Sequence, residues 1–321
     1  MEIKLTKADK IILKNISHNS RILEKELAKK CNLSKDSIRY RIKRMESLGI
    51  ISGYGVFIDY TPLGYESYKL YLKLNATTKH KDELINFLRS QKHVFSVFES
   101  NGNWDIGTAI FAKNRNEYVE IENKLLSKFG SIISSRKFCL MNNAVIFENK
   151  LFGGANIRQF EVWNGQNREL IDKIDVEILN ILNKNSKESL VNIGAKIKLS
   201  ADSVSKRIKK LESKKIISFY PSNINYRFLG YEKYKLFVYV KDYSTEVEKK
   251  IFDYFKEVPN TLNIIRTIGP WKLEIEFLIS THDDFQKILS VFQENFSKYV
   301  LKIDFSIFRN DALFPSEKLL I

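Results

Sequence analysis

The sequence has few of the residues that build disulfide frameworks, metal centres or catalytic motifs. Its two cysteines, Cys31 and Cys139, lie in apolar or structured contexts, so we expect two buried free thiols in a reducing cytoplasm. Its four histidines are scattered, and none has metal-ligand spacing with a cysteine or another histidine. A glycine-rich phosphate loop and a nucleophile-elbow serine are also missing. The sequence therefore predicts no metal, no cofactor and no enzyme activity.

Long apolar runs are missing as well. The apolar stretches are only a few residues long, which is too short to cross a bilayer. The first residues lack the apolar core of a signal peptide. Hydrophobic residues nevertheless make up 44% of the 321 positions, which is enough to bury several cores. We expect a folded cytoplasmic protein with no membrane partner.

Acidic residues are outnumbered by basic ones. The chain has 53 Lys and Arg against 38 Asp and Glu, which gives a net charge of +15. Residues 1–60 hold 13 basic against 7 acidic residues, and residues 168–226 hold 12 against 7, so these two stretches carry +11 of that charge. A basic surface of this size favours polyanionic partners such as nucleic acid. A lysine-rich protein from an AT-rich genome is the alternative explanation.

The two basic stretches belong to an internal repeat. Residues 9–70 recur without a gap at 175–236, and the correspondence continues from Gly102 and Trp104 to Gly269 and Trp271 with one residue inserted. A repeat of this length is a domain arrangement present twice, not a short solenoid unit. The paired glycines and the Asn-Gly step within 151–169 are loop signals, so this stretch is expected to link the two halves.

The start of each half has the pattern of three short helices. Thr6 and Asp9 have the spacing of a capping box, Ser34 is placed to cap a third helix, and Gly49 is placed to end it. Apolar residues on one face of that third helix are Ile38, Ile42 and Met45. Three helices with a tight turn before a basic third helix have the form of a helix-turn-helix. The alternative is a three-helix bundle with a solvated basic face.

In a helix-turn-helix the free face of the third helix can lie in the major groove, where donors reach base edges and marginal Lys and Arg bind phosphates. The base-edge candidates are Arg39, Tyr40 and Lys43 in the first copy, and Ser205, Lys206 and Lys209 in the second. The phosphate candidates are Lys35, Arg44 and Lys210. Arg41 and Arg207 lie on the semi-buried side and are expected to make structural or phosphate contacts. Because the two reading faces differ, we expect non-identical half-sites.

A family resemblance supports the DNA-binding interpretation. The motif residues are Leu33-Ser34, Ile38, Arg41-Ile42-Lys43-Arg44-Met45-Glu46, Gly49-Ile50-Ile51, Tyr54 and Leu63-Gly64-Tyr65. This string closely resembles the Lrp/AsnC family of prokaryotic transcription regulators. The second copy keeps most of it, including Leu199-Ser200, Arg207-Ile208 and Leu229-Gly230-Tyr231. It departs at Lys215, where the first copy has Gly49, so its third helix is expected to end differently.

The second part of each half predicts a βαββαβ order, the ferredoxin-like arrangement. Residues 68–74 alternate like a half-exposed strand, residues 81–91 and 116–129 have helical spacing, and a hairpin turn is expected at 101–103. The second copy repeats the pattern from 234 to 308. The predicted fold class is therefore α+β, with two winged helix-turn-helix domains alternating with two ferredoxin-like domains.

The resemblance also implies a site for a small-molecule effector, such as an amino acid, near the central hairpin. The matching residues are Gly102, Trp104, Asp105, Gly269, Trp271 and Lys272. Asp105 could hold an amino group and Lys272 a carboxylate. The alternative is a plain hairpin with a packed tryptophan, since a fold does not dictate a ligand. The change from Asp105 to Lys272 argues against two equivalent effector sites.

These observations predict a tandem-duplicated regulator that binds double-stranded DNA as an intramolecular pseudo-dimer, with further oligomers left open. The expected limits are 1–60 and 170–226 for the helix-turn-helix domains, 61–150 and 227–321 for the ferredoxin-like domains, and 151–169 for the linker. The expected location is the cytoplasm, in association with the nucleoid. A DNA-compacting protein of low specificity is the main alternative. Siroheme decarboxylases resemble the same family, but the His-Asn-Tyr-type segment that they carry is missing from residues 97–102.

Overall fold

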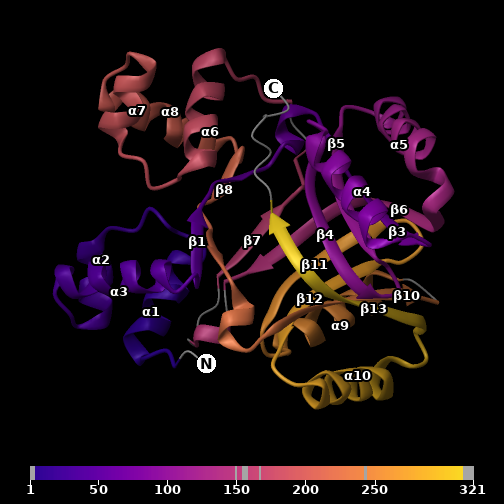
Figure 1. Ribbon diagram of the computed structural model, residues 1–321. Coiled ribbons are helices and arrows are strands. Elements are labelled where there is room, and N and C mark those ends of the chain that lie inside the picture. Colours follow the sequence, from indigo (N-terminus) through magenta and orange to yellow (C-terminus); the bar gives the residue numbers. More distant parts are fainter. Residues whose placement is uncertain (1–3, 149, 154–157, 166–167, 242–243, 314–321) are drawn as a thin grey trace. The chain divides into compact units, whose positions relative to one another are not determined.

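The computed structural model describes residues 4–148, 150–153, 158–165, 168–241 and 244–313. These residues form two compact units, and each unit draws on both halves of the chain. The helix-turn-helix unit contains the described residues of 1–59, 147–160 and 169–232. The barrel unit contains those of 60–146, 161–168 and 233–321. Figure 1 shows the elements of both units, coloured along the chain.

The helix-turn-helix unit contains two three-helix modules. Their helices are α1 (Lys7–Ile16), α2 (Glu24–Cys31), α3 (Lys35–Ser47), α6 (Lys173–Lys184), α7 (Leu190–Ile197) and α8 (Ala201–Ser213). The capping box at Thr6 is confirmed, because Thr6 and Asp9 exchange hydrogen bonds between side chain and backbone. The core of the first module includes Ile12, Leu13, Ile38 and Met45, which are fully buried. Apolar burial at helical spacing therefore fixes α3 against α1 and α2, as the pattern predicted.

The ends of α3 and α8 correct one expectation. Gly49 follows α3 with a φ of 71°, the left-handed conformation that favours glycine. Lys215 follows α8 with a φ of 57°, and α8 ends at Ser213 just as α3 ends at Ser47. The prediction that the second helix ends differently was therefore wrong. Packing of the buried Ile216 beyond the turn keeps the left-handed residue in place even though lysine disfavours it.

The two modules exchange strands. The strands are β1 (Ile51–Tyr54), β2 (Phe57–Ile58), β8 (Ile217–Phe219) and β9 (Ser222–Ile224). β1 of the first module pairs antiparallel with β9 of the second, and β2 pairs antiparallel with β8. Because β8 and β9 are the repeat counterparts of β1 and β2, the two pairings are equivalent. Each wing is therefore built from one strand of each module.

The barrel unit contains the two βαββαβ repeats that the sequence predicted. The first repeat is β3 (Glu66–Leu74), α4 (Thr78–Ser90), β4 (Val94–Gly102), β5 (Ile106–Ala112), α5 (Arg115–Phe129) and β6 (Ile133–Phe147). The second is β10 (Glu232–Val240), α9 (Thr245–Glu257), β11 (Thr261–Ile268), β12 (Leu273–Ile279), α10 (His282–Phe296) and β13 (Val300–Leu313). The barrel unit also contains η1 (Thr61–Leu63) and η2 (Gly130–Ile132), whereas η3 (Lys150–Phe152) and η4 (Tyr226–Leu229) belong to the helix-turn-helix unit. The residues of β7 (Gln159–Val162) are divided between the two units.

The two four-stranded sheets join edge to edge at both sides. The strand order is β11-β12-β10-β13-β4-β5-β3-β6, with β7 beside β6, and β6 also pairs with β11. The seam between β13 and β4 places Ser306 opposite Gly102, and the seam between β6 and β11 places Val145 opposite Ile264. Eight strands therefore form a closed ring, and closure removes the free edges of both sheets.

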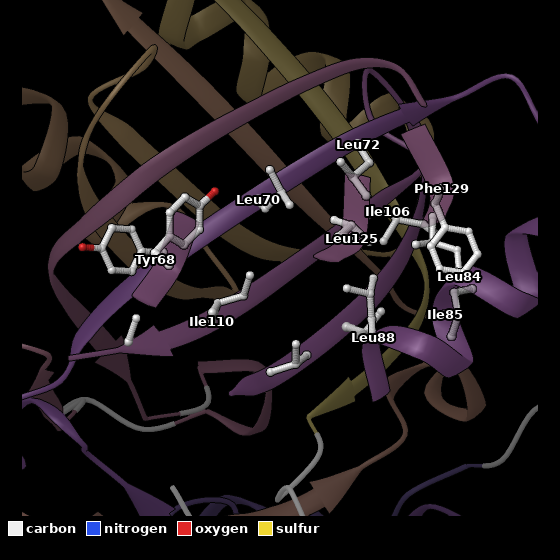
Figure 2. Packing of buried hydrophobic residues seen from close by; sticks show 14 residues of the cluster. Tyr68, Leu70, Leu72, Leu84, Ile85, Leu88, Ile106, Ile110, Leu125 and Phe129 are labelled. Carbon is white, nitrogen blue, oxygen red and sulfur yellow. The ribbon is translucent and has the colours of Figure 1, made fainter. Parts of the chain in front are cut away.

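The strands of the ring are covered on one face by helices. In the first half, Tyr68, Leu70 and Leu72 of β3 pack with residues of α4 and α5 in a cluster that Figure 2 shows. The alternate residues of β3, Lys69 and Tyr71, point to the other face and are also buried. The expectation of a half-exposed strand was therefore wrong, because the opposite sheet covers the face that carries the lysine.

Candidate nucleic-acid interface

The third helix of the first module presents a basic face to solvent. The Ser34 hydroxyl accepts a hydrogen bond from the backbone of Ser37 and caps the start of α3. Four of the sequence-predicted residues on this helix are exposed, and a fifth, Arg44, is half-buried. The exposed residues are Lys35, Arg39, Tyr40 and Lys43. Tyr40 exposes 69% of its surface, which is a large aromatic area without cover in this unit.

Arg39 is already engaged by acids. Its guanidinium lies 2.7 Å from the Glu24 carboxylate on α2 and 3.1 Å from Asp36. The hydrogen bonds that Arg39 donates to Glu24, together with the charge of that carboxylate, raise the pKa of Arg39. These ion pairs are exposed, so they stabilise the fold little and can open when a phosphate or a base competes. Lys43 makes no ion pair with the described residues, and it is the better-presented donor.

Arg41 holds α3 against α1. Its guanidinium lies 3.0 Å from the buried Asp9 carboxylate and donates to the hydroxyl of Thr6. Burial would raise the pKa of Asp9, but hydrogen bonds from Thr6 and the charge of Arg41 outweigh it and lower the pKa. Arg44 lies 3.8 Å from the same carboxylate. The structural role expected of Arg41 is confirmed, and Arg44 shares in it.

The second module keeps this anchor. The guanidinium of Arg207 lies 2.7 Å from Asp175 and 2.8 Å from Asp172. The hydrogen bonds that Arg207 donates to Asp172 and Asp175 raise its pKa. The exposed face of α8 carries Lys206, Lys209 and Lys210, whereas Ser205 is half-buried. The two recognition helices are therefore anchored alike, while their outer faces differ.

Residues at equivalent positions meet where the two modules join. The hydroxyls of Ser20 and Ser186, which are repeat counterparts, are 2.6 Å apart and buried. The backbone N–H of Ser20 donates to Tyr220 at 2.8 Å, and that of Ser186 donates to Tyr54 at 3.2 Å. Arg21 also donates to the carbonyl oxygen of Ser186. The serine contacts are therefore the same from both sides, as in a two-fold-like arrangement of two similar modules, whereas the Arg21 contact is made from one side.

His18 lies in an aromatic pocket of the same unit. Its ring stacks on Phe160 with centroids 5.0 Å apart, and it lies 5.4 Å from the ring of Phe219. Burial lowers the pKa of His18 to about 4, although a hydrogen bond with the backbone of Phe147 acts in the opposite direction. The imidazole is therefore neutral at physiological pH. Its repeat counterpart is Lys184, so the second module has no equivalent group.

The effector candidates of the first half lie at the hairpin between β4 and β5. The Asp105 carboxylate accepts a hydrogen bond from the Leu74 backbone at 2.8 Å and lies 3.2 Å from the Lys73 ammonium. Trp104 is buried, and a Cβ added at Gly102 would meet a carbonyl oxygen of β13 at 2.6 Å. The Asp105 carboxylate is therefore already bonded to Leu74 and Lys73 of the same half. Gly102 permits the close approach of β4 and β13.

In the second half the same positions are packed in the ring. The Trp271 indole N–H donates to Glu274 at 3.0 Å, and the Lys272 backbone N–H donates to Val238 at 3.0 Å. A Cβ added at Gly269 would meet Cys139 at 2.7 Å. The carboxylate partner of Trp271 could not be predicted from the repeat, because the first half has Gly107 at the position of Glu274.

Both modules match known domain families. Residues 171–212 match the AsnC-type helix-turn-helix domain, and residues 5–52 match a winged helix-turn-helix DNA-binding domain. The two matches cover the two modules of the helix-turn-helix unit. This architecture is that of a winged-helix transcription regulator with two DNA-binding modules in one chain.

Curated relatives define the family more closely. An HTH-type transcriptional regulator of Pyrococcus furiosus is 31% identical over 122 residues, which are 38% of this chain and 82% of the relative. The HTH-type transcriptional regulator LrpA of Pyrococcus horikoshii is 30% identical over 41% of this chain and 90% of its own length. The chain belongs to the Lrp/AsnC family of transcription regulators. Each relative corresponds to less than half of this chain, as expected if the chain is a tandem fusion.

A solved structure matches nearly the whole chain. The siroheme decarboxylase NirDL aligns with 98% of this chain and 94% of its own, with a TM-score of 0.64 and 10% sequence identity. At this identity the likeness is one of fold.

In the part of the chain that the structure describes, no helix has both the length and the apolar character needed to cross a membrane.

Proposed function

We propose that the chain is a sequence-specific DNA-binding regulator in which one polypeptide does the work of a dimer. α3 and α8 would enter successive major grooves, with their centres about 34 Å or a small multiple of that apart along the duplex. Lys43, Lys206 and Lys209 would reach base edges or nearby phosphates. Tyr40 would contact a base edge or a thymine methyl, a contact that the second module cannot copy.

The joint between the two modules carries this proposal. The wings are exchanged reciprocally, and Ser20 meets its own counterpart Ser186. Such a joint supports a fixed relation between α3 and α8, which is what a protein needs to read two half-sites at a set spacing. Two modules on a flexible tether would instead tolerate many spacings.

The asymmetry of the reading faces favours a specific regulator over a DNA-compacting protein. A compacting protein needs basic charge but no particular side chains on its recognition helices. Here Arg39 and Tyr40 stand where the second module has Ser205 and Lys206, on an otherwise shared scaffold. We therefore propose an operator with two related but different half-sites.

Footprinting of purified protein on genomic fragments tests this proposal. We expect protection of defined sites, each with two contacted segments, at concentrations that leave the flanking DNA open. Uniform coating of every duplex would identify a compacting protein instead. A chain with Lys43→Ala and Lys209→Ala is the control for contacts made by the recognition helices.

Modulation by an effector such as an amino acid also stays a proposal. The ligand would have to displace the contacts of Asp105 with Lys73 and the Leu74 backbone, or use Lys272 at the corresponding hairpin. Thermal shift with each common amino acid tests the idea, with Asp105→Asn and Lys272→Met as variants. A stabilising amino acid whose effect disappears in one variant would support the site. No shift with any amino acid would count against amino-acid effectors.

A further inference from the structure

A cluster of ionisable side chains lies inside the ring of the barrel unit. The ammonium of Lys69 on β3 is 2.6 Å from Oε2 of Glu274 on β12. The ammonium of Lys235 on β10 is 3.2 Å from the same oxygen and 2.8 Å from Oε1 of Glu276. Lys69, Lys235 and Glu274 expose 5%, 1% and 0% of their surface. Charges so far from water are costly unless each one has a partner.

The acids of this cluster come from one half only. The counterparts of Glu274 and Glu276 in the first half are Gly107 and Ala109. A Cβ added at Gly107 would lie 2.0 Å from the ring of Phe98, so the aromatic ring fills the space that a longer side chain would need. The first half therefore has neither the acids nor, at Gly107, the room for one of them.

Three side chains of the first half reach the charged groups of the second. Lys69 and Cys139 both contact the carboxylate of Glu274, the thiol at 3.6 Å. The Tyr71 hydroxyl accepts a hydrogen bond from the Lys235 ammonium at 3.2 Å. The counterparts of these three residues in the second half are Lys235, Ser306 and Phe237. The Tyr71 hydroxyl, which accepts the hydrogen bond from Lys235, is therefore present in the first half and missing from the second, where Phe237 stands.

The electrostatics depend on both halves. Burial would raise the pKa of Glu274, but the charges of Lys235 and Lys69 outweigh it and lower the pKa to about 2. Burial lowers the pKa of Lys69, and Glu274 does not fully offset this because Lys235 lies beside it. Burial acts on Lys235 in the same direction, but Glu274 and Glu276 together raise its pKa. Each half thus supplies charge that stabilises charge in the other.

Pairing of like halves would upset this balance. A barrel of two first halves would bury two copies of Lys69 and bring no counterpart of Glu274 to meet them. A barrel of two second halves would keep a lysine at the position of Lys69, but it would bury a second set of the two acids and put Phe237 and Ser306 in place of Tyr71 and Cys139. Lys69 has the Glu274 carboxylate as a partner only when a first half pairs with a second half. The same pairing gives Lys235 the Tyr71 hydroxyl in addition to Glu274 and Glu276.

We propose that this buried cluster is a selectivity device that makes the first and second ferredoxin-like halves partners for each other and excludes barrels built from two like halves of neighbouring chains. The partner surface of Lys69, Tyr71 and Cys139 fits the acidic face of β12. The cluster therefore sets which half faces which, and it does so independently of any contact with DNA.

A cross-link across the seam between β6 and β11 tests the proposal in the full-length chain. Asn143 and Arg266 lie opposite each other there, one in each half. A chain with Asn143→Cys and Arg266→Cys is refolded under oxidising conditions, and the yield of the 143–266 disulfide is measured by peptide mapping. Mapping is needed because Cys31 and Cys139 are also thiols. The same chain is prepared with Lys69→Glu, with Glu274→Lys, and with both reversals.

We expect nearly complete cross-linking with the native charges, a loss of about tenfold for each single reversal, and recovery of most of the yield in the double reversal. Single reversals without effect, or a double reversal as poor as the singles, would overturn the proposal. Reversal of the exposed Arg136–Glu122 pair, which lies within the first half, is the matched control and should leave the yield unchanged.

A neutral set of variants gives a second measure. Lys69→Met and Glu274→Gln remove one partner each, and the double variant removes both. Each single variant should raise the equilibrium constant for unfolding. In the double variant we expect that constant to be about tenfold smaller than the value obtained by multiplying the two single effects. Single effects that simply multiply would show that the two groups do not act on each other, and would contradict the proposal.

Discussion

α3 and α8 occupy equivalent places in their modules, begin behind equivalent serine caps and end at the same position. Arg41 and Arg207 anchor them to equivalent acids. Their exposed faces, however, carry Arg39 and a free tyrosine ring in one case and lysines in the other. Duplication has thus kept the buried scaffold of these modules and changed the surface that meets a partner.

The two ferredoxin-like halves have diverged in a different place. Their helices and strands follow the same order, but inside the ring Glu274 and Glu276 of the second half stand where the first half has Gly107 and Ala109. Change on an outer face alters what the protein binds, whereas change at an inner face alters which half can pack against which. The two kinds of divergence therefore predict different phenotypes.

The salt dependence of the DNA affinity tests whether both modules bind DNA. Of the changes predicted here, it is expected to be the largest. With about 6–10 phosphate contacts per chain, affinity should fall roughly 10³–10⁵-fold between 50 and 200 mM salt. Mobility shift across that range gives the slope. A slope of about half this size would mean that one module binds alone, and a flat response would contradict a phosphate-contacting interface.

Removal of one equivalent lysine from each module tests their shared chemistry. Lys43→Ala with Lys209→Ala should weaken binding by about 2–6 kcal/mol, because each contact contributes about 1–3 kcal/mol. A sizing column should show the same elution volume as the parent chain, since both side chains are exposed. Lys92→Ala with Lys256→Ala, two lysines of the barrel unit, is the charge-matched control. Equal losses in both double variants would point to net charge instead of the recognition helices.

Exchange of the reading face tests the difference between the modules. A chain with Arg39→Ser and Tyr40→Lys has the second module's residues on both helices. It should prefer an operator made of two copies of the second half-site by about 1–3 kcal/mol over the native site. Quantitative mobility shift on the native and the two symmetrised operators measures this. Equal affinity of the native chain for both symmetrised operators would show that the faces do not differ in what they read.

A methyl group at Gly107 tests the difference inside the ring. Gly107→Ala places a Cβ against the buried ring of Phe98, so it should destabilise the protein by about 1–3 kcal/mol in urea unfolding. Gly130→Ala is the control, because no atom lies within 4 Å of a Cβ added there. Recovery of stability on combining Gly107→Ala with Phe98→Leu would confirm the cause. Unchanged stability of Gly107→Ala alone would show that the first half still has room for a side chain.

Acid sensitivity should separate the first module from the second. The pKa of His18 falls from 6.5 to about 4 on folding, so its stabilising effect is present above pH 6.5 and is lost as the pH falls towards 4. Stability at pH 5 should be lower than at pH 7 by about 1–2 kcal/mol from this group. His18→Phe should reduce the difference, whereas His80→Gln, at an exposed site, should not. The same pH response in both variants would exclude His18 as its source.

The sequence predicted the fold class because the decisive patterns are local. Ile38, Ile42 and Met45 repeat at helical spacing, and capping residues mark where the helices begin. The exchange of wings was not predictable, because β2 has two residues and either module could have completed its own wing. The predicted domain limits, from 1–60 to 227–321, stay predictions.

Burial by a distant part of the chain explains the remaining errors. Lys69 alternates with apolar residues, which suggested a strand with one solvent-exposed face. In the structure Lys69 is buried and pairs with Glu274, more than two hundred residues away in the sequence. Lys215 suggested a changed helix end, but the packing beyond the turn outweighs the preference of one residue. Of the predicted interface residues, Tyr40, Lys43, Lys206 and Lys209 are presented as expected, and their contact with DNA stays a proposal.

The most direct test of the account is a hydroxyl-radical footprint at low ionic strength on a selected binding site. Two modules held in a fixed relation should protect two segments on the same face of the duplex, with centres about 34 Å or a small multiple of that apart. A single protected segment, or a protein that leaves every duplex unshifted in the same buffer, would contradict it.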